Sequence, residues 1–197
     1  MSNSEWISIF DGQSLDGWST TGQPEGWMVE NECIVCTVQG GKYLYTQDQY
    51  ENFVLSVDFK IAEKTNSGIF FRWSDLGDPV HTGIEIQIFD SYGQEVATTH
   101  TCGAIYDMVA PSSNPSKPAG EWNNILITSV PNHISVEKNG VQIAEMDVEQ
   151  WEDAGKNADG SKNKFKYAWK DMPQKGHIGL QDHGGKVWFR NLKIQKL

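Results

Sequence analysis

Most apolar segments of the chain alternate hydrophobic and polar residues with a period of two. In Phe53–Ile61 the odd positions are all apolar, and Ser56, Asp58 and Lys60 fall on the opposite face. Residues 83–88 place three isoleucines on one face and two polar residues on the other. Successive side chains of a β-strand point to opposite faces of a sheet, so this pattern predicts half-buried strands.

The same reasoning extends the predicted strands over most of the chain, to residues 67–73, 122–130, 133–138, 141–146, 177–181 and 187–194. Pro131-Asn132 and Asn139-Gly140 supply turns between three of them, and Asn-Gly is a strong hairpin signal. Many short strands at hairpin spacing predict an antiparallel all-β sandwich. Residues 98–120 and 149–175 break the pattern and predict two long loops, which in compact domains are usually functional.

Length and charge restrict the classes of protein to consider. A chain of 197 residues fits one sandwich-sized domain, residues 1–197. It contains no apolar run of about 18 residues, which argues against a transmembrane helix. A net charge of −10 repels phosphate backbones and anionic lipids, so neither nucleic acid nor a membrane is an expected partner.

The start of the chain, MSNSEWISIF, lacks the basic and apolar regions of a signal peptide. This predicts a cytoplasmic protein, or a periplasmic or secreted one if the chain is a trimmed mature form. The 3 cysteines are an odd number and cannot form a complete disulfide framework.

Several sequence blocks resemble the 3-keto-disaccharide hydrolase family. They are FDG (10–12), LDGW (15–18), NSGIFFR (66–72), GIEIQIFD (83–90), CGAIYD (102–107), KPAGEWN (117–123), GHIGLQDHGGKVWFRNLKI (176–194) and the insert KNADGSKNKFKYAWKDMP. The resemblance covers nearly the whole chain. It implies a concanavalin A-like jelly-roll sandwich that cleaves the glycosidic bond of 3-keto-glycosides or 3-keto-disaccharides, with a small carbohydrate as substrate.

A sandwich of the implied type binds sugars on a concave sheet face, and strand parity predicts which side chains point there. The predicted set is Asp58, Arg72, Glu85, Gln87, Gln181 and His183. Polar residues on a sheet face can equally be its solvated side, and that interpretation stays open. Tyr106 and Trp122 are candidates for stacking on a sugar ring, although a tryptophan is more often part of the core.

The chemistry of the substrate decides which residues are needed. A retaining glycosidase uses two carboxyl groups about 5–5.5 Å apart, but the position two residues after Glu85 is Gln87. In a 3-keto sugar the ketone acidifies the C2 proton, and the resulting enolate expels the C1 substituent. Elimination therefore needs a base near C2, a cation or donor at the C3 oxygen and an acid for the leaving group.

We predict Glu85, His183 and Arg72 as the catalytic residues, and we expect Asp58, Gln87, Gln181, Tyr106 and Trp122 to bind substrate. His183 suits acid or base work because the unperturbed imidazole pKa is about 6.5. Two plainer interpretations remain: Arg72 forms a salt bridge with Asp58, and His183, which precedes Gly184-Gly185, is a turn residue.

Other features leave alternatives open. Glu85, His183 and one further carboxylate would suffice for a divalent metal ion, so a metal cofactor is an alternative. Cys33 and Cys36 face opposite sides of a predicted strand, which argues against a redox or zinc role. A non-catalytic, lectin-like carbohydrate-binding module is the alternative function. The sequence leaves open the choice between hydrolase and lyase, the anomer, the aglycone and the oligomeric state.

Overall fold

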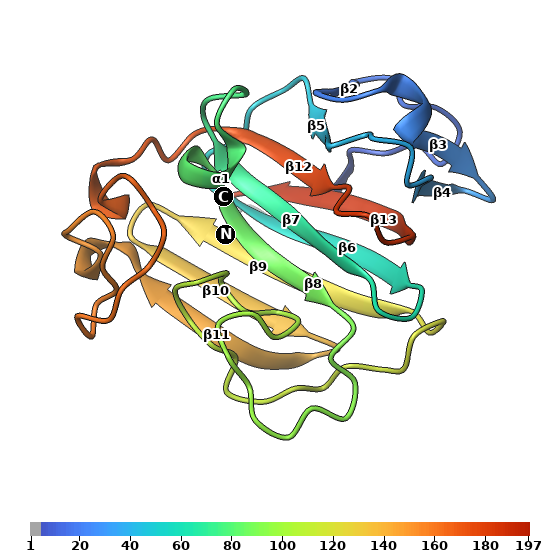
Figure 1. Ribbon diagram of the computed structural model, residues 1–197. Coiled ribbons are helices and arrows are strands. Elements are labelled where there is room, and N and C mark those ends of the chain that lie inside the picture. Colours follow the sequence, from blue (N-terminus) through green and yellow to red (C-terminus); the bar gives the residue numbers. More distant parts are fainter. Residues whose placement is uncertain (1–4) are drawn as a thin grey trace.

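The computed structural model describes residues 5–197 as two antiparallel β-sheets packed face to face (Figure 1). The larger sheet has 8 strands, in the order β11 (Val141–Asp147), β10 (His133–Lys138), β9 (Asn123–Val130), β6 (Phe53–Ile61), β13 (Val187–Lys196), β4 (Cys33–Cys36) and β3 (Trp27–Glu30), with β1 (Ile7–Ser8) beside β13. The smaller sheet has 5 strands, in the order β2 (Trp18–Thr20), β5 (Tyr43–Thr46), β12 (His177–Gln181), β7 (Asn66–Trp73) and β8 (Ile84–Phe89). The predicted all-β, antiparallel jelly-roll fold is confirmed.

Helical structure among the described residues is short. It comprises α1 (Pro79–Thr82), between β7 and β8, and the 3-10 turns η1 (Pro24–Gly26), η2 (Val148–Gln150) and η3 (Trp169–Asp171). No helix in residues 5–197 has the length and apolar character needed to cross a bilayer. The segment MSNSEWISIF, which lacks a signal-peptide pattern, lies partly outside the described residues, since these begin at residue 5.

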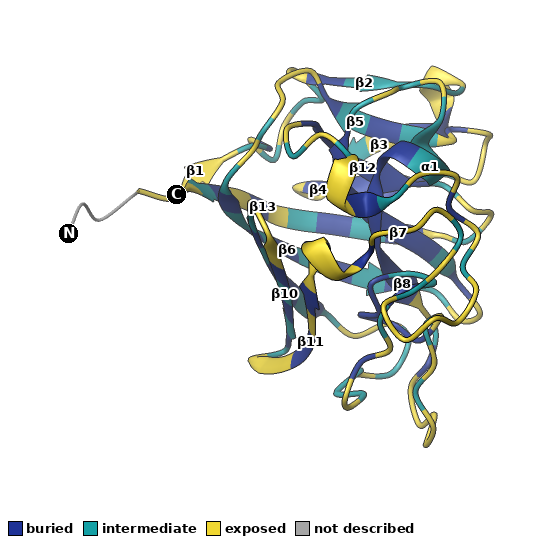
Figure 2. Ribbon diagram, turned by 90° about the vertical axis from the view of Figure 1, so that its left-hand side faces the viewer, coloured by how far each residue is buried: buried dark blue, intermediate teal, exposed yellow. Residues whose placement is uncertain are grey.

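The core lies between the two sheets and follows the period-two pattern. Leu55 and Val57 of β6, and Ile84, Ile86 and Ile88 of β8, are fully buried. Strands β7 and β8 are buried along almost their whole length in Figure 2. This is because the core covers one face of these strands, while pocket side chains and loops cover the other.

The first long loop, residues 98–120, continues the smaller sheet beyond β8. The amide of Gly103 donates to the Gln87 carbonyl at 2.7 Å, and the amide of Gln87 donates to the Ala104 carbonyl at 3.0 Å. The amide of Tyr106 donates to the Glu85 carbonyl at 2.9 Å. Residues 103–106 therefore cover the edge of β8 and place Tyr106 beside Glu85.

Buried Lys138 anchors this loop to the larger sheet. Its Nζ donates to the Cys102 carbonyl at 2.8 Å, to Asn114 Oδ1 at 3.1 Å and to Ser116 Oγ at 2.6 Å. Three acceptors compensate much of the cost of burying an ammonium group, although burial still lowers the pKa of Lys138.

The second long loop, residues 149–175, is tied to the first through Asp107. Asn157 Nδ2 donates to the Asp107 carbonyl at 3.2 Å, and the amide of Lys164 donates to Asp107 Oδ2 at 2.9 Å. The two loops together bring Lys164 to the outer face of the smaller sheet.

Candidate active site

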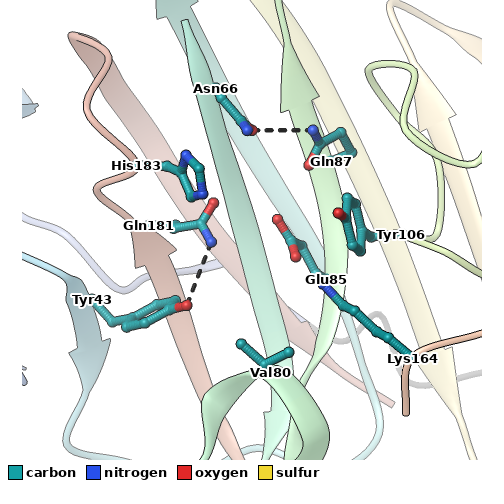
Figure 3. Close-up of a pocket in the computed structure, with 9 residues that line it drawn as sticks. All are labelled: Tyr43, Asn66, Val80, Glu85, Gln87, Tyr106, Lys164, Gln181 and His183. Atoms are coloured by element: carbon teal, nitrogen blue, oxygen red, sulfur yellow. Dashed lines mark hydrogen bonds between the residues drawn. The ribbon is translucent and has the colours of Figure 1, made fainter.

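A pocket lies on the face of the smaller sheet that points away from the core, with a volume of about 130 Å³ (Figure 3). Its lining comes from four strands, α1 and three loops, and comprises Tyr43, Asn66, Val80, Glu85, Gln87, Tyr106, Lys164, Gln181 and His183. Five of the predicted site residues therefore meet here: Glu85, Gln87, Tyr106, Gln181 and His183.

Glu85 is the single carboxylate of this lining and lies at its centre (Figure 3). Its side chain is packed over Gly68 of β7, where any β-carbon would collide with the carboxylate. Only 8% of the residue is exposed, and among the described residues its carboxylate forms no hydrogen bond. Burial raises the pKa of Glu85 to about 8, while the nearby charge of Lys164 opposes the rise.

Two glutamines frame the carboxylate. Gln87 Nε2 donates to Asn66 Oδ1 at 3.1 Å, and Gln181 Nε2 donates to the Tyr43 hydroxyl at 3.4 Å. Both amide groups are thereby oriented by a neighbour in the pocket wall (Figure 3).

Lys164 and His183 lie on either side of Glu85 (Figure 3). Lys164 Nζ lies 4.0 Å from the centroid of the Tyr106 ring, a cation–π distance that fixes the ammonium at the pocket. His183 is exposed in the turn after β12, where the Gly184 amide donates to Asp182 Oδ1 at 3.1 Å. His183 is thus a turn residue and a pocket residue at once.

The prediction that Arg72 shares the face of Glu85 is wrong. Arg72 has a φ of +52°, and the register of β7 against β12 shifts between His177 and Gly179. This irregularity turns the Arg72 side chain into the molecule, where its Nε donates to Ser129 Oγ at 2.9 Å. Its other two nitrogens donate to the backbone carbonyls of Val130 and Pro131. Burial lowers the pKa of Arg72 to about 10. The guanidinium joins the two sheets and does not reach the pocket.

Asp58 and Trp122 also lie away from the pocket, on the outer face of the larger sheet. Asp58 accepts from Asn124 Nδ2 at 2.9 Å and from Asn191 Nδ2 at 2.7 Å, and lies 3.6 Å from Arg190 Nε. The Arg190 guanidinium lies 3.9 Å from the centroid of the Trp122 ring. The predicted single face is therefore wrong for Asp58 and Trp122, and the alternative salt bridge between Arg72 and Asp58 is not formed.

Four pocket residues were not predicted as site residues: Tyr43, Asn66, Val80 and Lys164. Asn66 is the first residue of the block NSGIFFR and lies two positions before Gly68, on the same face of the strand. Strand parity therefore indicates that Asn66 lies on the outer face. Lys164 lies in a polar loop without periodicity, so no pattern in the sequence places it.

The donor sets for metal and redox chemistry are incomplete in the described part of the chain. Within residues 5–197, no group of three or more His, Cys, Asp or Glu side chains lies close enough to hold a metal ion, so Glu85 and His183 lack the third ligand that the metal hypothesis needs. Cys33 and Cys36 are buried free thiols, and burial raises the pKa of Cys36 to about 12. A thiol with such a pKa is unreactive at neutral pH.

Known proteins resemble this chain in sequence and in fold. A 3-keto-disaccharide hydrolase from Bacteroides thetaiotaomicron is 27% identical over 227 aligned residues, which cover 98% of this chain and 78% of the relative. A crystal structure from Parabacteroides distasonis, provisionally assigned as a glycosyl hydrolase, has a TM-score of 0.89 at 34% identity and covers 98% of this chain and 100% of its own. The carbohydrate-binding module CBM66 from Bacillus subtilis has a TM-score of 0.58 at 11% identity, covers 98% of this chain and 100% of its own, and shows the fold alone.

The family assignment agrees with the resemblance of the sequence blocks. A model of the 3-keto-alpha-glucoside-1,2-lyase-like domain matches residues 5–195, so the match extends over nearly the entire chain. The chain therefore belongs to the 3-keto-alpha-glucoside-1,2-lyase-like domain family.

Proposed function

We propose that this protein is a carbohydrate-active enzyme that cleaves the glycosidic bond of 3-keto-glycosides, beginning with removal of the C2 proton. The observation that carries the proposal is one buried carboxylate, Glu85, between a lysine and a histidine in a pocket lined by no second carboxylate. The names of the relatives support the carbohydrate class. The lining does not support a two-carboxylate glycosidase, which needs a pair of such groups.

In the proposed reaction Glu85 accepts the C2 proton. The C–H electron pair forms the C2=C3 bond of an enolate, and the Lys164 ammonium stabilises the negative charge on the C3 oxygen. The enolate then expels the C1 substituent, whose oxygen takes a proton from His183, and an unsaturated keto sugar remains. Addition of water at C1 converts that sugar into the hydrolysis product.

The order of groups in the pocket matches the order of carbons in the sugar. Glu85 lies between His183 and Lys164 in Figure 3, as C2 lies between C1 and C3. In the proposed reaction Lys164 is therefore the cation at the C3 oxygen, in place of Arg72, which the sequence predicted as a catalytic residue.

The first test is isotopic. A 3-keto-glucoside incubated with the enzyme in heavy water is expected to give a product with deuterium at C2, or an unsaturated sugar, by mass spectrometry. The unoxidised glucoside is expected to stay intact. Cleavage with full retention of the C2 hydrogen would indicate direct displacement at C1, and binding without cleavage would favour the lectin-like alternative.

The pH dependence gives a second prediction. The mechanism requires an ionised base and a protonated acid, so kcat/KM should pass through a maximum as the pH changes, with one side of the profile set by the Glu85 pKa of about 8. Because Lys164 lowers the pKa of Glu85, the variant Lys164→Met should move this side of the profile to higher pH and lower the maximum. Lys166→Met is the matched control, since exposed Lys166 instead pairs with Asp78 at 3.2 Å. An unshifted profile in Lys164→Met would argue against Glu85 as the titrating base.

Gly68 gives a third prediction. Gly68→Ala should displace the Glu85 carboxylate and lower kcat/KM by about a hundredfold, because a misplacement of about 1 Å can cost that much. The double variant Gly68→Ala/Glu85→Asp makes room by shortening the acid, so it should recover melting temperature but not activity. Normal turnover in Gly68→Ala would show that the carboxylate does not need its present position.

A further inference from the structure

The pocket contains two buried carbonyl oxygens without a partner. Gln87 and Gln181 are only 3% and 7% exposed, and among the described residues neither side-chain oxygen accepts a hydrogen bond. Buried polar atoms in folded proteins are rarely left unpaired, because desolvation then goes uncompensated. Two such acceptors in one pocket point to a ligand that donates hydrogen bonds.

The surrounding contacts direct these oxygens away from the pocket wall. Asn66 Oδ1 accepts from Gln87 Nε2 at 3.1 Å. The Tyr43 hydroxyl accepts from Gln181 Nε2 at 3.4 Å. With each nitrogen engaged in the wall, each carbonyl oxygen remains for a ligand.

The two glutamines lie in one row across three strands. Gln87 of β8 pairs with Gly68 of β7, and Gln181 follows Leu180, which pairs with Ile69 on the other side of β7. Two strand spacings separate the backbones of the glutamines by roughly 9.6 Å. Gly68 contributes no side chain to the space between them, and the Glu85 carboxylate occupies it.

We propose that Gln87 and Gln181 accept hydrogen bonds from the two hydroxyl groups that flank the ketone, at C2 and C4 of the sugar. This inference rests on the proposed function, because it places the C2 carbon at Glu85. A ketone oxygen only accepts hydrogen bonds, so the two amide oxygens repel it and leave it facing Lys164.

The arrangement determines which substrates fit. Both hydroxyl groups must be free, so in a 1,2- or 1,4-linked chain only the unit at the non-reducing end fits. Sugars that carry a substituent on O2 or O4, including interior units of a 1,4-linked chain, are excluded.

The test measures binding separately from cleavage. The probe is 1,5-anhydro-3-keto-glucitol, which has no leaving group at C1, compared by calorimetry with its 2-deoxy and 4-deoxy forms. Each deoxy form should bind wild-type protein about 10–100-fold more weakly, since it leaves one buried acceptor unpaired. In each of the variants Gln87→Met and Gln181→Met, one deoxy form should bind as tightly as the parent probe, while the other deoxy form should still bind more weakly. Gln142→Met, an exposed strand glutamine, should behave as wild type.

Each outcome decides the proposal. It is overturned if wild-type protein fails to bind the probe, if it binds the deoxy forms as tightly as the parent, or if neither folded variant binds one deoxy form as tightly as the parent and the other more weakly. A variant that fails to fold leaves the decision to the wild-type series, which needs no substitution. Selective binding without cleavage of a 3-keto-glycoside would uphold this inference and contradict the proposed function.

Discussion

Glu85→Gln is expected to lower kcat/KM for a 3-keto-glycoside by about a thousandfold. Glutamine keeps the volume of the side chain over Gly68 but cannot accept the C2 proton, and a general base typically contributes about 10²–10⁴-fold. Steady-state kinetics at the pH where wild-type kcat/KM is highest give the widest range for the comparison.

The matched control for this variant is Glu30→Gln, an exposed glutamate of strand β3, which should leave turnover unchanged. Binding of the unreactive probe sugar to Glu85→Gln should persist, because the two amide acceptors remain. A Glu85→Gln enzyme that keeps more than about a tenth of wild-type kcat/KM would remove Glu85 from the role of base.

The same substitution is expected to stabilise the fold in alkaline solution. An unfolded chain releases the Glu85 proton near pH 4.5, whereas the folded protein holds it up to about pH 8. The folded state therefore binds the proton more tightly, and wild-type stability falls as the pH rises between these values. The full difference, on the order of 5 kcal/mol, applies above about pH 8 and disappears below about pH 4.5.

Thermal melts of wild type and Glu85→Gln between pH 4 and pH 9 measure this effect. At about 2–4 °C per kcal/mol for a protein of this size, the variant should melt roughly 10 °C or more above wild type at pH 9. The two curves should converge at about pH 4. A variant that melts below wild type at pH 9 would show that the ionised carboxylate is favourably solvated in the pocket.

The longer strands and the arrangement on β8 could be predicted from the sequence, because period-two alternation reports directly on burial, whereas the short strands β1, β2, β3 and β5 were not predicted. Strands β6, β10 and β12 begin and end at the predicted residues. Glu85 and Gln87 face the pocket because the three isoleucines between and beside them fill the core. Strand parity thus predicts the face of a side chain correctly where the strand has no irregularity in its backbone.

Arg72 shows where this reasoning stops. Alternation assumes extended backbone, and a residue at positive φ such as Arg72 shifts the alternation for the residues that follow it. The parity of Ile69 and Phe71 would place Trp73 in the core, but Trp73 lies on the outer face with Tyr43 and Tyr45. Nothing in the local sequence distinguishes an arginine that joins two sheets from one that binds substrate.

Asp58 and Trp122 show a different limit. Parity states that a side chain leaves the core, but a sandwich has two outer faces, and only the order of strands says which one. Lys164 shows a third limit, since its position depends on hydrogen bonds from two long loops to Asp107. Such long-range contacts have no periodic signature in the sequence.

The pairing of residues 103–106 with β8 also bears on solubility. Strand β8 is the last of the smaller sheet, and an open edge of that kind offers unpaired amides and carbonyls to other chains. The hydrogen bonds from the loop occupy these groups at Glu85 and Gln87. A variant that deletes or loosens this segment would expose an apolar, isoleucine-rich edge for intermolecular pairing, so the strand that carries the reactive carboxylate would become the place where aggregates start.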